Sequence, residues 1–176
     1  MITTGQKIAI EETKQSRLPA TDLANVKFGR TFSDHMFVMD YANGAWHKPH
    51  IEAFADLQMS PACLVLHYAQ TIFEGMKAYR TADGRVNLFR PQANIARMNK
   101  SAHRMCMPAI PEDLFLDALV ELVKLDRNWI PEGDEAALYI RPFMFASDEY
   151  IGVKPSDGYR FIIFTCPVRG YYNEPV

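Results

Sequence analysis

Two apolar stretches, AALYIRPFMF at residues 136–145 and YRFIIFTC at residues 159–166, are the strongest structural signals in this chain. Both runs are rich in β-branched and aromatic residues, which favour strands. The second run is apolar almost throughout, as is typical of a strand that is covered on both faces. We therefore predict two long strands, the second of them buried inside a sheet.

A hairpin is predicted upstream of these strands. Residues 35–41 (HMFVMDY) favour a strand, and Asn43 and Gly44 supply the left-handed residues of a tight turn. Proline cannot donate a hydrogen bond to a neighbouring strand, so we expect the return strand to end near Pro49.

A second hairpin and a helix follow. Residues 75–80 and 85–90 favour strands around a turn at Asp83-Gly84. Pro91 suits the first turn of a helix, and apolar residues follow it at helical spacing. The residues of this helix expected to face the core are Ile95, Met98, Ala102 and Met105.

Another helix is predicted from near Pro111 to about Trp129, with acidic residues at its positive N-terminal end. Its expected core residues are Phe115, Leu119, Leu122 and Val123. Hairpins, two helices and two long strands together indicate an α+β domain, with a mainly antiparallel sheet and two flanking helices.

Length and charge limit the possible functions. The chain has 176 residues, of which 48% are hydrophobic, which is enough for one domain plus a tail. It carries 19 basic and 21 acidic residues, a formal charge of −2. A protein that coats nucleic acid needs clustered lysine and arginine, so we expect no nucleic-acid partner.

The cysteines indicate the compartment. Cys63, Cys106 and Cys166 are widely separated and make neither a CxxC motif nor zinc spacing, so we expect buried free thiols and no metal site. The first thirty residues lack the apolar segment of a secretion signal. The longest apolar runs are shorter than the roughly 20 residues that span a bilayer. These features predict a soluble, cytoplasmic protein.

No repeat or charge block divides the middle of the chain. Residues 1–27 indicate a polar arm with weak structure, and residues 28–168 indicate one small domain. Beyond them the sequence is polar and contains proline and glycine, as is typical of a linker. We expect residues 169–176 to begin a linker to a second domain that this chain does not contain.

Tyr139 and Arg141 carry the clearest chemical signal. The period of two in a strand places both on one face. A guanidinium beside a phenol on an apolar sheet face is unfavourable unless an anion lies there. An edge strand, in which Arg141 meets solvent or an internal carboxylate, explains the pattern equally well.

Three further placements are possible site residues. Arg97 lies near the apolar flank of its predicted helix and is suited to binding phosphate, although a surface arginine with a buried stem is the simpler reading. Tyr68 and Phe73 are suited to walling a pocket or to filling the core. Residues 148–156 form a loop whose apolar side chains indicate either a partner surface or a return into the core. These side chains are Tyr150, Ile151 and Val153.

Taken together, seven segments resemble the branched-chain amino acid aminotransferases, pyridoxal-phosphate enzymes with the D-amino-acid-aminotransferase-like fold (fold type IV). They follow one another from Phe28 as FGRTFSDHMF, KPHIEAFADLQMSP, LHYAQTIFEGMKAYR, LFRPQANIARMNKSA, ELVKLDRNWIP, LYIRPFMFASDEYIGVKP and FTCPVRGYY. Their combination in this order is highly specific.

The resemblance implies that this chain is the smaller, N-terminal domain of such an enzyme. It implies that Arg97 holds the cofactor phosphate and that Tyr139 and Arg141 face the substrate. Phe28 and Phe73 match aromatic walls of the side-chain pocket. The residues that match those lent by each subunit of a homodimer to its neighbour are Tyr68, Ile151 and Val153.

The resemblance also implies reversible amino transfer between leucine, isoleucine or valine and 2-oxoglutarate, in branched-chain amino acid biosynthesis. The family's Schiff-base lysine lies beyond the linker, and none of the eight lysines here stands in its motif. We therefore predict that this chain contains no catalytic residue and is inactive in isolation. A D-amino acid aminotransferase or an aminodeoxychorismate lyase of the same fold, or a domain that only binds a partner, are the alternatives.

Overall fold

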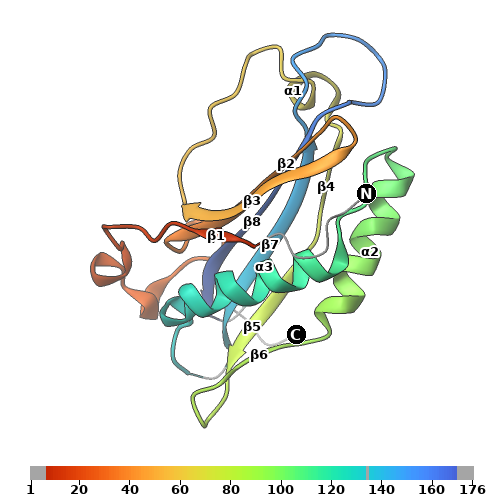
Figure 1. Cartoon of the computed structure of the whole chain (residues 1–176). Coiled ribbons are helices and arrows are strands. Elements are labelled where there is room, and N and C mark those ends of the chain that lie inside the picture. The colour runs from red at the N-terminus through yellow and green to blue at the C-terminus, as the bar shows by residue number, and fades with distance from the viewer. Residues whose placement is uncertain (1–6, 134, 170–176) are drawn as a thin grey trace, which may run out of the picture.

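The computed structural model of the chain describes residues 7–133 and 135–169. At its centre lies an eight-stranded sheet with the order β1-β3-β2-β8-β7-β5-β6, in which β4 also pairs with β7. The two long predicted strands are β7 (Ala136–Ala146) and β8 (Tyr159–Arg169), which pair antiparallel over their full length. Figure 1 shows them in the middle of the sheet. Their prediction is confirmed, and β8 is buried between β2 and β7.

Both predicted hairpins are present. The first joins β2 (His35–Ala42) to β3 (Ala45–Ala53), and the second joins β5 (Met76–Arg80) to β6 (Val86–Leu88). Positive φ angles occur in both turns, as expected for tight hairpins. They are 51° at Asn43, 78° at Gly44 and 81° at Gly84.

The expected end of the return strand near Pro49 is wrong, because β3 continues to Ala53. Lys48 has a φ of 51°, and the pairing with β2 shifts its register between Val38 and Asp40. The proline therefore lies at an irregularity in the ladder, where a missing N–H is tolerated.

The sheet is interrupted at Glu74 and Gly75, between β4 (Thr71–Phe73) and β5, although both strands pair with β7. Opposite the break lies Pro142, whose carbonyl accepts a hydrogen bond from the Glu74 N–H at 2.9 Å. In an antiparallel pair the N–H and C=O of one residue point to the same side, and proline has no N–H. The second hydrogen bond of this residue pair, from Pro142 to the Glu74 carbonyl, therefore cannot form.

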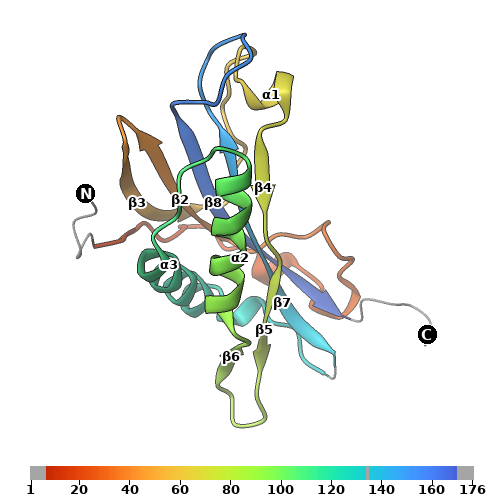
Figure 2. The same ribbon diagram turned by 90° about the vertical axis from the view of Figure 1, so that its right-hand side faces the viewer.

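Two helices cover one face of the sheet, α2 (Pro91–Arg104) and α3 (Glu112–Leu125) (Figure 2). Their predicted starts are confirmed, but α3 ends before Trp129, which lies in a separate 3-10 turn, Arg127–Trp129. Met105, expected in the core, is 40% exposed because it caps α2. The other predicted core residues are buried: Ile95, Met98, Ala102, Phe115, Leu119, Leu122 and Val123.

The opposite face of the sheet carries a second apolar cluster with aromatic rings around it. Its buried members are Met36, Val38, Phe145 and Ile162. The Phe32 and Phe54 rings stack on each other with centroids 5.0 Å apart, and Phe164 contacts both edge-on. We call this side of the sheet the aromatic face. The helices α2 and α3 pack on the other side.

The N-terminal arm is tied to the domain through short elements: β1 (Ala9–Ile10), which pairs parallel with β3, and two 3-10 turns, Leu18–Ala20 and Leu23–Asn25. The Thr13 N–H donates to Nε2 of His35 at 3.0 Å. Nδ1 of the same ring lies 2.7 Å from Oδ1 of Asp126, and both side chains are buried. One imidazole ring therefore links the arm to the segment that follows α3.

The three cysteines are free, and Cys63 and Cys166 are buried as expected. Cys106 is exposed, contrary to expectation, because it follows the end of α2 with a φ of 55°. Within residues 7–133 and 135–169, no helix has the length and hydrophobicity needed to cross a membrane, and no group of three metal-ligating side chains is present. The α+β class and the mainly antiparallel sheet are confirmed.

Candidate functional site

Tyr139 and Arg141 lie side by side on the aromatic face of β7, as the period of two predicts. Nη2 of Arg141 donates a hydrogen bond to the hydroxyl oxygen of Tyr139, and the two atoms are 2.9 Å apart. The Arg141 guanidinium lies over the Phe73 ring, 4.3 Å from its centroid, and Phe28 meets the Tyr139 ring edge-on at 5.0 Å. Four of the predicted site residues therefore form one cluster, which we call the Tyr139–Arg141 cluster: Phe28, Phe73, Tyr139 and Arg141.

The edge-strand explanation for Arg141 is excluded, because β7 pairs with β8 on one side and with β4 and β5 on the other. No carboxylate among the described residues pairs with Arg141. Its side chain is partly buried between the aromatic rings of Phe73 and Tyr139. A partly desolvated guanidinium with no acidic partner is a suitable receptor for an anionic ligand.

Arg97 makes a bidentate ion pair with Glu74 at the break between β4 and β5. Its Nε donates to Oε1 of Glu74 at 2.6 Å and its Nη2 to Oε2 at 2.7 Å. Glu74 is 5% exposed, whereas the Arg97 side chain is 67% exposed. Burial alone raises the pKa of Glu74, but hydrogen bonds from Arg97 and Asn94, with the charge of Arg97, bring it below its ordinary value. The same contacts raise the pKa of Arg97.

Gly75 connects this ion pair to the Tyr139–Arg141 cluster. A Cβ atom built on Gly75 would lie 2.4 Å from the Tyr139 hydroxyl oxygen, so the phenol packs directly on the backbone. On the other side, Asn94 donates to the Gly75 carbonyl at 3.4 Å. Arg97 and Arg141 are thus joined through a single short segment, Glu74-Gly75.

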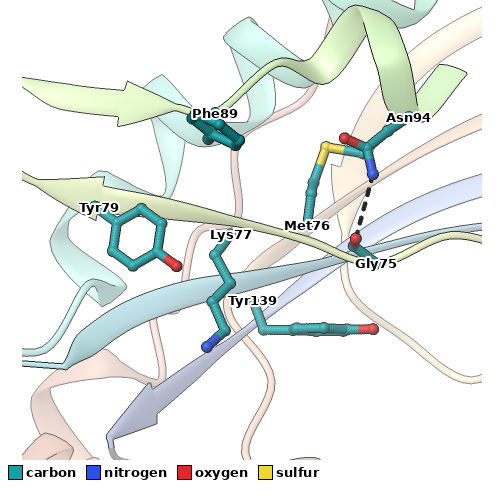
Figure 3. Close-up of a pocket in the computed structure, with 7 residues that line it drawn as sticks. All are labelled: Gly75, Met76, Lys77, Tyr79, Phe89, Asn94 and Tyr139. Carbon is teal, nitrogen blue, oxygen red and sulfur yellow. Dashed lines mark hydrogen bonds between the residues drawn. The ribbon is translucent and has the colours of Figure 1, made fainter.

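A pocket of about 580 Å³ adjoins this segment, within the usual size range of small-molecule sites. In Figure 3, Lys77 and Tyr139 lie on one side of the β5 ribbon, and Phe89 and Asn94 lie on the other. The pocket therefore extends around Gly75 from the aromatic face toward the start of α2. Its lining residues are Gly75, Met76, Lys77, Tyr79, Phe89, Asn94 and Tyr139.

The remaining predicted site residues lie elsewhere in the molecule. Tyr68 ends α1 (Val65–Tyr68), and Ile151 and Val153 lie in the loop between β7 and β8; Figure 1 shows these two segments together at the top. A hydrogen bond from the Leu64 N–H to the Asp148 carbonyl joins them. Tyr139 lies seven residues back from the end of β7, about 23 Å along the strand. All three side chains are exposed, at 42%, 66% and 94%.

Sequence reasoning missed Glu74, Gly75 and Asn94. Two signals were present: an acidic residue between apolar neighbours in IFEGM, and an asparagine one helical turn before Arg97. Neither signal is specific, because the burial of Glu74 depends on the break opposite Pro142. The pairing of Glu74 with Arg97 is therefore a product of the tertiary structure.

Replacing Gly75 by alanine is expected to destabilise the protein by about 1–3 kcal/mol, because the new Cβ overlaps the Tyr139 hydroxyl. Urea unfolding measures this loss. In a Tyr139→Phe background the nearest overlapping atom is gone, so the same substitution should cost clearly less. An equal cost in both backgrounds would show that Tyr139 does not limit the space above Gly75.

Solved structures identify the class of fold. The domain superimposes on a branched-chain aminotransferase of Escherichia coli with a TM-score of 0.60 and 24% identity, over 78% of this chain and 41% of that one. A T.th. branched-chain aminotransferase, solved in complex with N-(5'-phosphopyridoxyl)-L-glutamate, matches with a TM-score of 0.55 and 25% identity, over 73% of this chain and 40% of that one. The same T.th. enzyme was also solved with 4-methylvaleric acid. The fold is that of one part of an aminotransferase.

Relatives with higher sequence identity indicate which kind of aminotransferase this chain resembles. The chain is 49% identical to branched-chain-amino-acid transaminase 1 of Bacillus subtilis over 154 residues, and 45% identical to branched-chain-amino-acid aminotransferase 2 of the same organism over 174 residues. These matches cover 87% and 98% of this chain but 43% and 48% of the relatives, so the chain spans about half their length. No family model matches. The resemblance to the branched-chain aminotransferases is confirmed.

Proposed function

We propose that this chain is the small N-terminal part of a pyridoxal-phosphate-dependent branched-chain aminotransferase, which transfers amino groups between leucine, isoleucine or valine and 2-oxoglutarate. The fold would be of the D-amino-acid-aminotransferase type, with residues 1–27 as an arm, 28–168 as the domain and 169–176 as the start of a linker. The partly buried Arg141, without an acidic partner among the described residues, carries the proposal. The relatives of 41–49% identity support it.

The Tyr139–Arg141 cluster is suited to both kinds of substrate. Phe28, Phe73 and Tyr139 offer apolar ring surface, and each buried methylene of an aliphatic side chain contributes about 0.8 kcal/mol. Arg141 offers a charge-assisted bond for the second carboxylate of glutamate. The T.th. enzyme, solved with a glutamate derivative and with a branched acid, supports one site that accepts both.

Arg97 is suited to hold the cofactor phosphate. Its Nε and Nη2 contact Glu74, while its Nη1 makes no hydrogen bond to the described residues and the side chain is 67% exposed. Arginine binds phosphate through parallel N–H donors and keeps its charge at any physiological pH. When bound, pyridoxal phosphate would supply the electron sink for the transfer. The residues present therefore fit the cofactor.

We infer a homodimer for the complete enzyme, with the cytoplasm as its expected compartment. Tyr68, Ile151 and Val153 lie near the end of β7, which is about 23 Å along the strand from Tyr139. They are exposed, and they share one end of the sheet. Side chains placed in this way are suited to complete the pocket of a second subunit.

The test is to compare the 176-residue chain with the complete enzyme. The complete enzyme should convert leucine and 2-oxoglutarate to glutamate, whereas the chain alone should show no conversion above free pyridoxal phosphate, because it lacks the family's lysine motif. Activity of the chain alone would contradict this division of the enzyme. D-alanine as the preferred donor, or release of an aminobenzoate, would instead indicate the other enzymes of the fold, and no turnover at all would indicate a binding domain.

A further inference from the structure

Glu74 is the most deeply buried charged group near the pocket. Its carboxylate accepts four hydrogen bonds: two from Arg97, at 2.6 and 2.7 Å, one from Nδ2 of Asn94 at 3.1 Å, and a long one from the Gly75 N–H at 3.4 Å. Only 5% of Glu74 is exposed. Its position is fixed by the backbone, since the break in the sheet binds the Glu74 N–H to the Pro142 carbonyl.

Stability alone does not account for this pair. Burying a carboxylate is costly, and replacing a buried ion pair by apolar groups is often neutral or stabilising. Here the carboxylate is buried while its arginine partner is largely exposed. The chain therefore holds one partner rigidly inside the protein and presents the other to the solvent beside the pocket.

The geometry fixes the plane of the Arg97 guanidinium. A bidentate contact through Nε and Nη2 occupies one edge of the planar group and directs the other edge, with Nη1, away from Glu74. Asn94, one turn earlier on α2, prevents the carboxylate from rotating. A free arginine side chain would instead distribute its donors over many rotamers.

We propose that Glu74 is a positioning residue that orients Arg97 toward the phosphate of pyridoxal phosphate and thereby sets the affinity for this cofactor. The inference rests on the proposed function. The negative charge of Glu74 opposes phosphate binding, but Arg97 lies between the two anions. The gain from orienting the guanidinium exceeds this repulsion, because misplacing a binding group by about 1 Å can cost up to a hundredfold.

The experiment is a titration of the apo form of the complete enzyme with pyridoxal phosphate, followed by absorbance. Glu74→Gln, which keeps the volume but removes the charge, should weaken binding about tenfold. When Glu74→Gln is made in an Arg97→Ala background, it should change the affinity for pyridoxal phosphate less than about twofold, because Glu74 acts through Arg97. Pyridoxal, which lacks the phosphate, is the control ligand, and its dissociation constant should not change.

Asp40→Asn is the matched control variant, since Asp40 pairs with Nε and Nη2 of Arg160 in the same bidentate way, in a contact shared by β2 and β8. It should leave the affinity for pyridoxal phosphate unchanged. Equal loss from Glu74→Gln in both backgrounds, or no loss at all, would overturn the inference. If Arg97→Ala alone has no effect, the proposed role of Arg97 fails first, and the inference fails with it.

Asn94→Ala keeps the test decisive if Glu74→Gln does not fold. It removes a neutral bond to the carboxylate and a long bond to the Gly75 carbonyl, and the ion pair between Glu74 and Arg97 remains. We expect pyridoxal phosphate to bind about two- to threefold more weakly, again with no change for pyridoxal. Unchanged binding of both ligands would overturn the inference.

Discussion

Arg97→Ala in the complete enzyme is expected to weaken the binding of pyridoxal phosphate about a hundredfold, without changing the preference among amino acids. Losing a charged donor pair to phosphate corresponds to roughly 2–3 kcal/mol. Titration of the apo form gives the dissociation constant directly. Arg160→Ala, which removes the arginine of the pair with Asp40, is the control and should leave the constant unchanged.

The same substitution has a second consequence, because it removes the Arg97 donors and charge that lower the pKa of Glu74 and leaves only the weaker bonds from Asn94 and Gly75. Burial then raises the pKa of this carboxyl, and a buried unpaired charge destabilises the fold. Combining Arg97→Ala with Glu74→Gln should restore much of the stability but none of the cofactor affinity. An unchanged dissociation constant in Arg97→Ala would make Arg97 a surface arginine with no role in cofactor binding.

Arg141→Met is expected to separate the two substrates. Methionine keeps much of the volume over the Phe73 ring but removes the charge. Glutamate and 2-oxoglutarate should lose a charge-assisted contact of about 1.5–3 kcal/mol, a ten- to hundredfold loss of specificity. Leucine makes no such contact, so its reaction should change little or improve, because no unpaired guanidinium remains beside it.

Each half-reaction must be followed separately through the cofactor spectrum, so that a loss with one substrate does not conceal the other. Tyr139→Phe is a matched control, because it removes the hydroxyl that accepts from Arg141 and keeps the charge. It should affect glutamate much less than Arg141→Met does. An equal loss for leucine and glutamate in Arg141→Met would mean that Arg141 grips the α-carboxylate common to both.

The elements that follow from local rules were predictable from the sequence. Asn43, Gly44 and Gly84 adopt left-handed backbone that few other residues adopt, so both hairpins were found at the right place. Pro91 fixed the start of α2 in the same way. Errors arose where pairing overrides local preference, as at Pro49, where the register shift in the pairing with β2 accommodates the proline.

The candidate site was predictable only in part. The period of two brings Tyr139 and Arg141 together, and no longer-range information is needed for that. The contact of Arg141 with Phe73 requires β4 to pair with β7, and the contact of Tyr139 with Phe28 requires the chain after the arm to cross the aromatic face. Glu74 was missed because its burial depends on Pro142 in a different strand. The roles of these residues stay predictions.

The link between the arm and His35 fixes the tautomer of this ring. A neutral imidazole has one N–H, and its Nε2 accepts from Thr13, so the proton must lie on Nδ1, where it is donated to Asp126. Both ring nitrogens of His35 are therefore occupied, one by the arm and one by the residue that caps the end of α3, so a single side chain of β2 joins three segments that are distant in the sequence. The pairing of β1 with β3 and the bonds from Ser16 and Arg17 to Asp34 hold the same arm at other points.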